Sequence, residues 1–285
     1  MFNHHLMPLD AAQISPLDRG WTLADGCFET LRVVDGAAVW LDAHLARLRR
    51  GLHILALPEP DVARLPDDLA RLLAAHQERD GVARLQITRG IQPERGLAAS
   101  HYATPTMLLT LAPPVMLPAQ PVECRAIIAT RTRRNEWSPL SQIKATANYP
   151  DLLLALAEAH ERGADEALLR NTAGAVVCGT VANVWAVRSE CLHTPPLNAG
   201  ATAGILRQHL IAAAQSWGVT VVETPLSPAD ILNADEVLLT NVVRGVQAVV
   251  SLDGQLIGNG TAGAMAQRVL AWVRVAQGLG IRTVR

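Results

Sequence analysis

The chain has 285 residues, of which 49% are hydrophobic and 18% charged, and its 25 basic and 26 acidic residues give a formal net charge of −1. This composition is typical of a globular chain with a large core, and it excludes disorder, collagen-like repetition and a small disulfide scaffold. The balanced charge favours no nucleic-acid partner. There is neither an apolar run of the ~18 residues that a membrane span needs nor a signal-peptide pattern, so we expect a cytoplasmic protein that binds no membrane.

The elements expected in the first part of the chain are those of an α+β domain. Two apolar runs around Asp35–Gly36 predict a hairpin with a type I′ turn. Leucines with helical spacing predict a helix over residues 41–57, in which Arg47 lies off the leucine stripe. The other elements expected here are a helix over residues 67–80 and strands over residues 83–89 and 104–112.

A proline-rich segment separates this part from the rest of the chain. Residues 113–121 contain four prolines in nine positions, a pattern that continues neither a helix nor a strand. We therefore expect two domains, a smaller one over residues 1–117 and a larger one over residues 118–285.

The second part of the chain also alternates between strand and helix patterns. Gly200 and Gly204 precede a predicted helix, whose N-terminal N–H groups could bind an anion. The other expected elements are a strand over residues 122–131, a helix over residues 151–164, strands with a turn over residues 166–187 and a strand over residues 237–254.

Lysine occurs only once in the chain. Of the 25 basic residues, 24 are arginine and one, Lys144, is lysine. Arginine supplies positive charge but not a primary amine that can lose its proton and attack a carbonyl. The spacing alone leaves open whether Lys144 is such a nucleophile or an ordinary loop residue.

Motifs for other chemistries are absent from the sequence. The cysteines form no CxxC pair and the nine histidines lack metal-ligand spacing, so we expect neither a disulfide nor a metal site. There is no GxSxG elbow, no phosphate-binding P-loop and no GxGxxG turn after a strand. A serine hydrolase, an ATPase and a dinucleotide enzyme are therefore disfavoured.

Five segments of the chain resemble the motifs of one family, in the family's order. They read LDRGWTLADGCFETLRVVDG (residues 17–36), HLARL (44–48), IKATANYP (143–150), GADEALLRNTAGAVVCGTVANVWAV (163–187) and ADEVLLTNVVRGVQAV (234–249). The chain thereby resembles the fold-type IV pyridoxal-phosphate enzymes, which include branched-chain and D-amino-acid aminotransferases and 4-amino-4-deoxychorismate lyase. The resemblance implies an α+β fold of two domains, pyridoxal 5'-phosphate as cofactor and a homodimer.

The resemblance also implies which residues hold the cofactor. Lys144 matches the Schiff-base lysine, which places that lysine and most of the cofactor site in the larger domain. Arg47 matches the arginine that binds the cofactor phosphate, a role suited to a guanidinium. The remaining matches to the family's phosphate contacts are Gly204, Ile205, Leu206, Asn241 and Val242.

Thr30 favours the lyase among the members of this family. The resemblance gives a threonine at this position a proton-relay role in aminodeoxychorismate lyases, and a hydroxyl can both donate and accept a proton. An ordinary strand residue is the alternative reading of Thr30. The lyase substrate carries two carboxylates, for which Arg95, Arg32 and Arg89 are the candidate partners.

Cys178 departs from the family pattern, which has glutamate at this position. A carboxylate keeps the cofactor's ring nitrogen protonated, whereas a thiol is too weak a donor or acceptor to do so. We therefore keep three hypotheses, namely the lyase, a class IV aminotransferase acting on an amino acid or amine, and a catalytically impaired paralogue that binds the cofactor.

Overall fold

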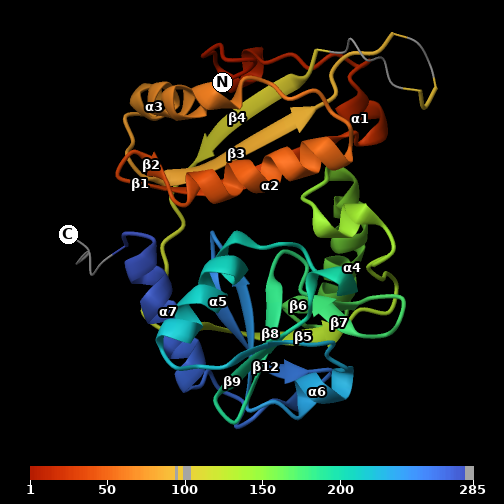
Figure 1. The fold of residues 1–285 in the computed structure, drawn as a ribbon, viewed down its shortest axis with the longest axis vertical. Coiled ribbons are helices and arrows are strands. Elements are labelled where there is room, and N and C mark those ends of the chain that lie inside the picture. Colours follow the sequence, from red (N-terminus) through yellow and green to blue (C-terminus); the bar gives the residue numbers. More distant parts are fainter. Residues whose placement is uncertain (94–95, 99–103, 280–285) are drawn as a thin grey trace. The chain divides into compact units, whose positions relative to one another are not determined.

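The computed structural model describes residues 1–93, 96–98 and 104–279 (Figure 1). The chain divides into two compact units. The first consists of Met1–Val115 and Ile143–Asn148, and the second of Met116–Gln142 and Tyr149–Arg285. We call them the N-terminal unit and the C-terminal unit.

The N-terminal unit is built on a four-stranded antiparallel sheet with the strand order β2-β1-β3-β4. Asp35 and Gly36 join β1 to β2 and have φ values of 50° and 87°, as the predicted type I′ turn requires. The strands are β1 (Gly26–Val34), β2 (Ala37–Ala38), β3 (Gly81–Thr88) and β4 (Thr106–Ala112).

Two helices cover one face of this sheet. Helix α2 (Leu41–Ile54) packs on β1, and α3 (Leu65–His76) packs on β2 and β4 (Figure 1). The strand residues on that face are almost fully buried, as are the leucine stripes of both helices. A short helix, α1 (Arg19–Leu23), and 3-10 turns at Leu9–Ala11 and Val62–Arg64 complete the unit before residue 115.

A glycine allows α2 to approach β1 closely. A Cβ atom placed on Gly51 of α2 would lie 2.9 Å from the Sγ atom of Cys27 in β1. Both residues are buried. Glycine is therefore the residue that this contact accommodates without displacing the thiol.

The C-terminal unit is built on a nine-stranded mixed sheet. The strand order is β10-β9-β8-β11-β12-β5-β6-β7, and β13 also pairs with β12. The strands are β5 (Val122–Ile128), β6 (Glu166–Arg170), β7 (Val176–Cys178), β8 (Asn183–Arg188), β9 (Cys191–Thr194), β10 (Val221–Glu223), β11 (Glu236–Asn241), β12 (Gly245–Leu252) and β13 (Gln255–Leu256).

In the described part of this unit, four helices accompany the sheet. They are α4 (Tyr149–Glu161), α5 (Ile205–Ser216), α6 (Pro228–Leu232) and α7 (Ala264–Ala276), with 3-10 turns at Pro139–Gln142 and Leu197–Ala199. Helix α4 packs on β6, α5 on β10 and β11, and α7 on β11 and β12. Apolar clusters on the strands and helices form the core of this unit.

The structure differs from the sequence prediction in the placement of the lysine segment. The predicted boundary after residue 117 lies close to the observed change of unit between Val115 and Met116. Residues 143–148, which we expected in the larger domain, instead pack with the N-terminal unit because they bond to β1. The single strand expected over residues 237–254 is a hairpin of β11 and β12, joined by a turn at residues 242–244.

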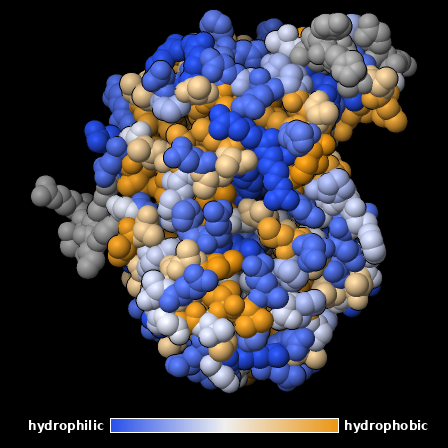
Figure 2. All heavy atoms as spheres, in the orientation of Figure 1, coloured by the Kyte–Doolittle hydropathy of each residue, from blue (hydrophilic) through white to orange (hydrophobic). Residues whose placement is uncertain are grey.

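The surface mixes hydrophilic and apolar side chains on the face shown in Figure 2. Large apolar side chains such as Trp21 and Trp137 are exposed, as isolated apolar residues often are. Within the described part of the chain, no helix has both the length and the apolar character that crossing a membrane requires.

We expect Gly51→Ala to lower the free energy of unfolding of the N-terminal unit by about 1–3 kcal/mol, because the new methyl group overpacks the contact with Cys27. Urea-induced unfolding measures this change. Cys27→Ala removes the obstructing sulfur, so the double variant should recover most of the loss. A single variant as stable as the parent, or a double variant no more stable than the single one, would contradict this packing.

Candidate functional site

The only lysine of the chain is attached to the first half of β1 by backbone pairing. The Phe28 N–H donates to the Lys144 carbonyl oxygen at 3.0 Å. Cys27 and Ala145 form an antiparallel bridge beside this bond. Ile143 and Ala145 are buried on either side of the lysine. The position of Lys144 is therefore set by the sheet of the N-terminal unit.

The amine of Lys144 lies over an aromatic ring. Its Nζ atom is 4.6 Å from the centroid of the Phe28 ring. Burial, together with the positive charges of Arg47 and Arg84, lowers the pKa of Lys144 to about 8, against the opposing charge of Glu29. A lysine with this pKa has a neutral, nucleophilic amine in a large fraction of molecules at mildly alkaline pH.

A buried carboxylate, Glu29, joins β1 to α2. Its Oε1 atom accepts from Arg47 Nε at 2.8 Å, and its Oε2 atom accepts from Arg47 Nη2 at 2.5 Å. Oε2 also lies 2.7 Å from Nδ1 of His44. Burial acts to raise the pKa of Glu29, but the charge and hydrogen bonds of Arg47 and His44 outweigh it and lower the pKa to about 2.

The carboxylate of Glu29 also fixes which ring nitrogen of His44 carries the proton. Burial lowers the pKa of His44 although Glu29 opposes the shift, so the ring is neutral near pH 7. A carboxylate can only accept, so Nδ1 of His44 carries the proton, and Nε2 is an acceptor that has no hydrogen-bond partner among the described residues. Glu29 and His44 were not among the predicted site residues, although both stand inside the motifs that carry the family resemblance.

Arg47 thus has one edge of its guanidinium held by Glu29. This contact orients the arginine on α2 and balances part of its charge. Its role in binding a phosphate stays a prediction.

The second face of the N-terminal sheet carries polar side chains. Successive side chains of a strand point to opposite faces, so Phe28, Thr30 and Arg32 share the face opposite α2. Thr30 pairs directly with Arg84 of β3, and both side chains are partly exposed. Because the Lys144 amine contacts Phe28, Thr30 lies on the same face as that amine. We call this surface the open face.

Arg32 lies on the open face but is almost completely buried. Its Nη1 atom donates to the Val115 carbonyl at 2.7 Å. Burial lowers its pKa, while the charge of Asp80 raises it. Its predicted role in binding a substrate carboxylate stays a prediction.

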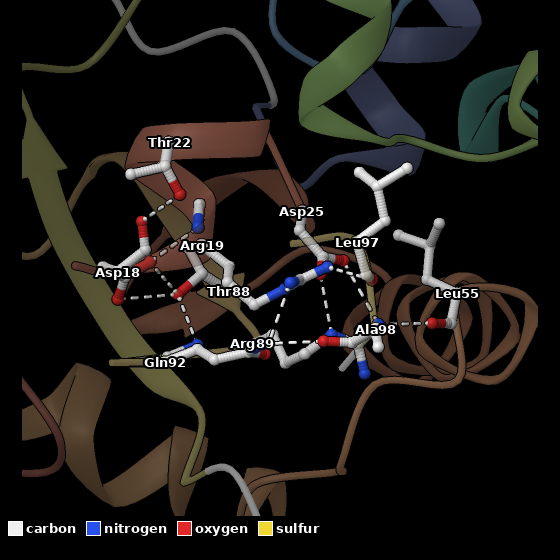
Figure 3. A network of polar contacts seen from close by, with 12 residues as sticks. Asp18, Arg19, Thr22, Asp25, Leu55, Thr88, Arg89, Gln92, Leu97 and Ala98 are labelled. Atoms are coloured by element: carbon white, nitrogen blue, oxygen red, sulfur yellow. Dashed lines mark hydrogen bonds and ion pairs between the residues drawn. The ribbon is translucent and has the colours of Figure 1, made fainter. Parts of the chain in front are cut away.

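Arg89 belongs to a polar network at the end of β3 (Figure 3). Its guanidinium donates to both carboxylate oxygens of Asp25 and to the carbonyl oxygens of Leu55 and Ala56, which follow α2. Arg19 donates to the same Asp25. These contacts engage most of the donors of Arg89 and stabilise the end of α2. Its predicted role in binding a substrate carboxylate stays a prediction.

The same network reaches the segment that follows β3. Arg19 donates to the carbonyl oxygens of Gly96 and Leu97, and Gln92 donates to that of Ala98. Arg95, the other predicted carboxylate ligand, lies outside the described residues. The network therefore fixes the backbone on the C-terminal side of Arg95.

In the C-terminal unit, Gly204 precedes α5 as predicted. No side chain caps this helix, so the N–H groups of its first turn, including those of Ile205 and Leu206, form a potential anion site. A Cβ on Gly204 would lie only 1.9 Å from Oδ1 of Asn183. Glycine therefore keeps the backbone at the start of α5 close to β8.

Asn241 and Val242 lie at the turn between β11 and β12. The Asn241 side chain accepts from the backbone N–H groups of Val243 and Arg244 at 3.0 and 2.7 Å. The carbonyl oxygen of Val242 accepts from Gln277 Nε2 at 2.9 Å. These bonds shape the turn, and a contact of either residue with a phosphate stays a prediction.

Cys178 ends β7 in apolar surroundings. Its neighbours include Leu169 and Val177 in one apolar cluster. Burial raises the pKa of the Cys178 thiol to about 11, with Arg134 lowering it and Glu166 raising it. The thiol is therefore neutral at physiological pH and offers no carboxylate-like charge.

The predicted site residues thus fall into two groups, one within each unit. The structure brings Lys144, Arg47, Thr30 and Arg32 onto or beside β1, and the side chain of Arg89 belongs to the network of Figure 3. Among the residues that the structure describes, no three histidine, cysteine or acidic side chains form a metal-binding group.

Comparison with known proteins gives consistent matches over most of the chain. A putative branched-chain-amino-acid aminotransferase of Methanocaldococcus jannaschii is 31% identical over 259 residues, which cover 90% of this chain and 89% of that protein. The crystal structure of 4-amino-4-deoxychorismate lyase from Pseudomonas aeruginosa is 32% identical, with a TM-score of 0.81 and coverage of 96% of this chain and 98% of that one.

A third match shows the same fold at lower identity. The branched-chain aminotransferase of Thermobaculum terrenum, solved in its PLP form, is 24% identical with a TM-score of 0.87, covering 99% of this chain and 94% of that one. The α+β fold of two units is therefore that of class IV aminotransferases, as expected. Residues 26–252 match the family described as amino-transferase class IV, and the chain belongs to that family.

Proposed function

We propose that this protein is a pyridoxal 5'-phosphate-dependent 4-amino-4-deoxychorismate lyase, which releases pyruvate from its substrate and leaves 4-aminobenzoate for folate biosynthesis. The observation that carries the proposal is the position of Thr30. Its side chain shares the open face of β1 with Phe28, over whose ring the Lys144 amine lies. A hydroxyl near the amine can relay a proton during elimination.

Pyridoxal 5'-phosphate is the cofactor of this family, and the residues present suit it. Lys144 supplies the primary amine that attaches the cofactor, with a pKa lowered to about 8. The uncapped start of α5 at Gly204 offers N–H donors for a phosphate. Arg47, aligned by Glu29, is the proposed phosphate-binding arginine.

The chemistry supplied by the bound cofactor is that of an electron sink for the carbanion formed at the substrate carbon. The chain's own residues move the protons. The neutral amine of Lys144 takes the proton from the amine-bearing carbon of the ring. Thr30 relays a proton to the departing enolpyruvyl group, and aromatisation of the product draws the reaction forward.

A class IV aminotransferase is the second candidate function. The M. jannaschii relative, a putative branched-chain-amino-acid aminotransferase, supports it. This relative is 31% identical to the chain, which is nearly the 32% identity of the P. aeruginosa lyase. One scaffold hosts both chemistries. A catalytically impaired paralogue is the third candidate, and Cys178 is its sole support. For each candidate we propose a homodimer, as the family resemblance implies, and a cytoplasmic location, as expected from the sequence.

We expect pyridoxal 5'-phosphate to attach only to Lys144, at a rate that increases with pH up to about 8, because burial lowers the pKa of the amine to about 8 and only the neutral amine attacks. Borohydride reduction followed by peptide mass spectrometry locates the attachment. Lys144→Arg keeps the charge and should abolish it. Unmodified Lys144 in a cofactor-saturated, reduced sample would refute the assignment, as would a rate that keeps increasing to pH 10.

We expect Thr30→Val to slow pyruvate release by roughly 10²–10⁴-fold, the usual contribution of general acid–base catalysis, because the variant keeps the side-chain shape and loses the hydroxyl. Thr30→Ser restores a hydroxyl and is the matched control. Cofactor absorbance should be unchanged in both variants. Full lyase activity in Thr30→Val would support a strand-forming role and favour the aminotransferase.

We expect this protein to show weak or no amino transfer while it retains lyase activity, because a neutral thiol at position 178 cannot hold a proton on the ring nitrogen. Cys178→Glu should increase any transaminase half-reaction more than it increases pyruvate release. Single-turnover absorbance and pyruvate assays measure the two rates, with Cys178→Gln as the uncharged control. Unchanged rates of both reactions in Cys178→Ala would show that Cys178 is only a buried core residue.

A further inference from the structure

His44 of α2 is a fully buried histidine with one side-chain hydrogen bond in the described part of the chain. Its exposed fraction is 0%. Its Nδ1 atom donates to Oε2 of Glu29 at 2.7 Å, and its Nε2 atom has no partner among the described residues. A buried acceptor without a partner costs free energy that an apolar side chain would avoid. The bond to Glu29 is therefore the contact that explains a histidine at this place.

His44 and Arg47 bind the same carboxylate from one face of α2, because residues three positions apart on a helix are neighbours. Oε2 of Glu29 accepts from both side chains, at 2.7 Å from His44 Nδ1 and 2.5 Å from Arg47 Nη2. Oε1 accepts from Arg47 Nε at 2.8 Å. The arginine binds the carboxylate through two parallel bonds, and the histidine supplies a second point of attachment. Together the two side chains fix the rotation of the carboxylate.

The bond from His44 orients Glu29 without adding a charge. Burial lowers the pKa of His44, so its ring is neutral near pH 7. The carboxylate of Glu29 is ionised at that pH, since its pKa is about 2. Loss of the His44 donor would therefore leave the charges of Glu29 and Arg47 in place. It would change the direction in which the guanidinium of Arg47 is held, and not the strength of its charge.

We propose that His44 is a positioning residue for the cofactor phosphate. Its Nδ1–H fixes the carboxylate of Glu29, and Glu29 in turn holds the guanidinium of Arg47 in the orientation that binds the phosphate. This inference rests on the proposed function for the cofactor and for the role of Arg47. A guanidinium binds a phosphate through parallel hydrogen bonds, whose geometry depends on its orientation. His44 acts through Glu29 and needs no contact with the phosphate.

The test compares two aldehydes that differ only in the phosphate. Pyridoxal 5'-phosphate and pyridoxal are titrated by absorbance into the full-length protein after its cofactor has been removed, and the ratio of their Kd values measures the preference for the phosphate. His44→Leu removes the donor, His44→Asn places an amide donor near the position of Nδ1, and His44→Gln places it near that of Nε2. His53→Leu is the matched control, because His53 is an exposed histidine of the same helix.

We expect His44→Leu to reduce the preference for the phosphate by roughly tenfold, which corresponds to one hydrogen bond. The affinity for pyridoxal 5'-phosphate should fall while that for pyridoxal stays unchanged. His44→Asn should keep most of the preference, and His44→Gln should lose it as His44→Leu does. The ³¹P resonance of the bound cofactor should shift in His44→Leu and stay in place in His53→Leu.

An equal loss of affinity for both aldehydes in His44→Leu would show that His44 only supports the fold, and would overturn the inference. An unchanged preference in His44→Leu would overturn it as well. Should His44→Leu fail to fold, the other two His44 variants decide, and an equal preference in His44→Asn and His44→Gln would refute the role of Nδ1.

These outcomes are distinguishable from a failure of the proposed function. Arg47→Gln with the preference of the parent protein would refute the phosphate role of Arg47, and this inference with it, while pyruvate release would still test the lyase. If the parent protein releases no pyruvate, the lyase fails, and the two titrations still decide the role of His44 because neither of them depends on turnover.

Discussion

The pairing of Lys144 with β1 is the interaction on which the arrangement of the candidate site depends. The hydrogen bond from Phe28 N–H to the Lys144 carbonyl is a backbone bond, so it fixes the lysine whatever side chains surround it. Burial of Ile143 and Ala145 on both sides holds the segment against the sheet. The amine is thereby kept in surroundings that lower its pKa to about 8.

The second requirement is that the carboxylate of Glu29 stays away from the amine of Lys144. Glu29 forms buried bonds with Arg47 and His44, and breaking such a pair by removing one partner costs about 3–5 kcal/mol. Its carboxylate would lower the nucleophilicity of Lys144 if it lay beside the amine, because a nearby negative charge stabilises the ammonium form. The alternation of β1 limits this effect, since Glu29 and Phe28 point to opposite faces, and the pKa of Lys144 stays lowered although the charge of Glu29 raises it.

The sequence predicted those parts of the structure that depend on local pattern. The turn at Asp35–Gly36, the helices with leucine stripes and the strand alternation follow from residue spacing, and the structure confirms them. The attachment of residues 143–148 to β1 could not be predicted, because that contact joins segments more than 100 residues apart and leaves no periodic signal. The family resemblance placed Lys144 in the cofactor site but in the other domain.

The sequence predicted which residues belong to the candidate site better than it predicted the contacts that those residues make. Arg32, Arg47 and Arg89 were all singled out as anion-binding arginines, and the structure shows three different surroundings for them. An arginine's side chain is long enough for its partners to be decided by tertiary structure. Arg84 was missed because its signal lies in the register between two strands, which the sequence of β3 alone does not contain.

The register of β1 and β3 is itself favoured by close packing at the start of β1. A Cβ on Gly26 would lie 2.6 Å from the Ile87 carbonyl oxygen of β3. A shift of β1 by one residue would bring a larger side chain to this place and would turn Glu29 onto the open face. Gly26 therefore helps to determine which charges the Lys144 amine meets.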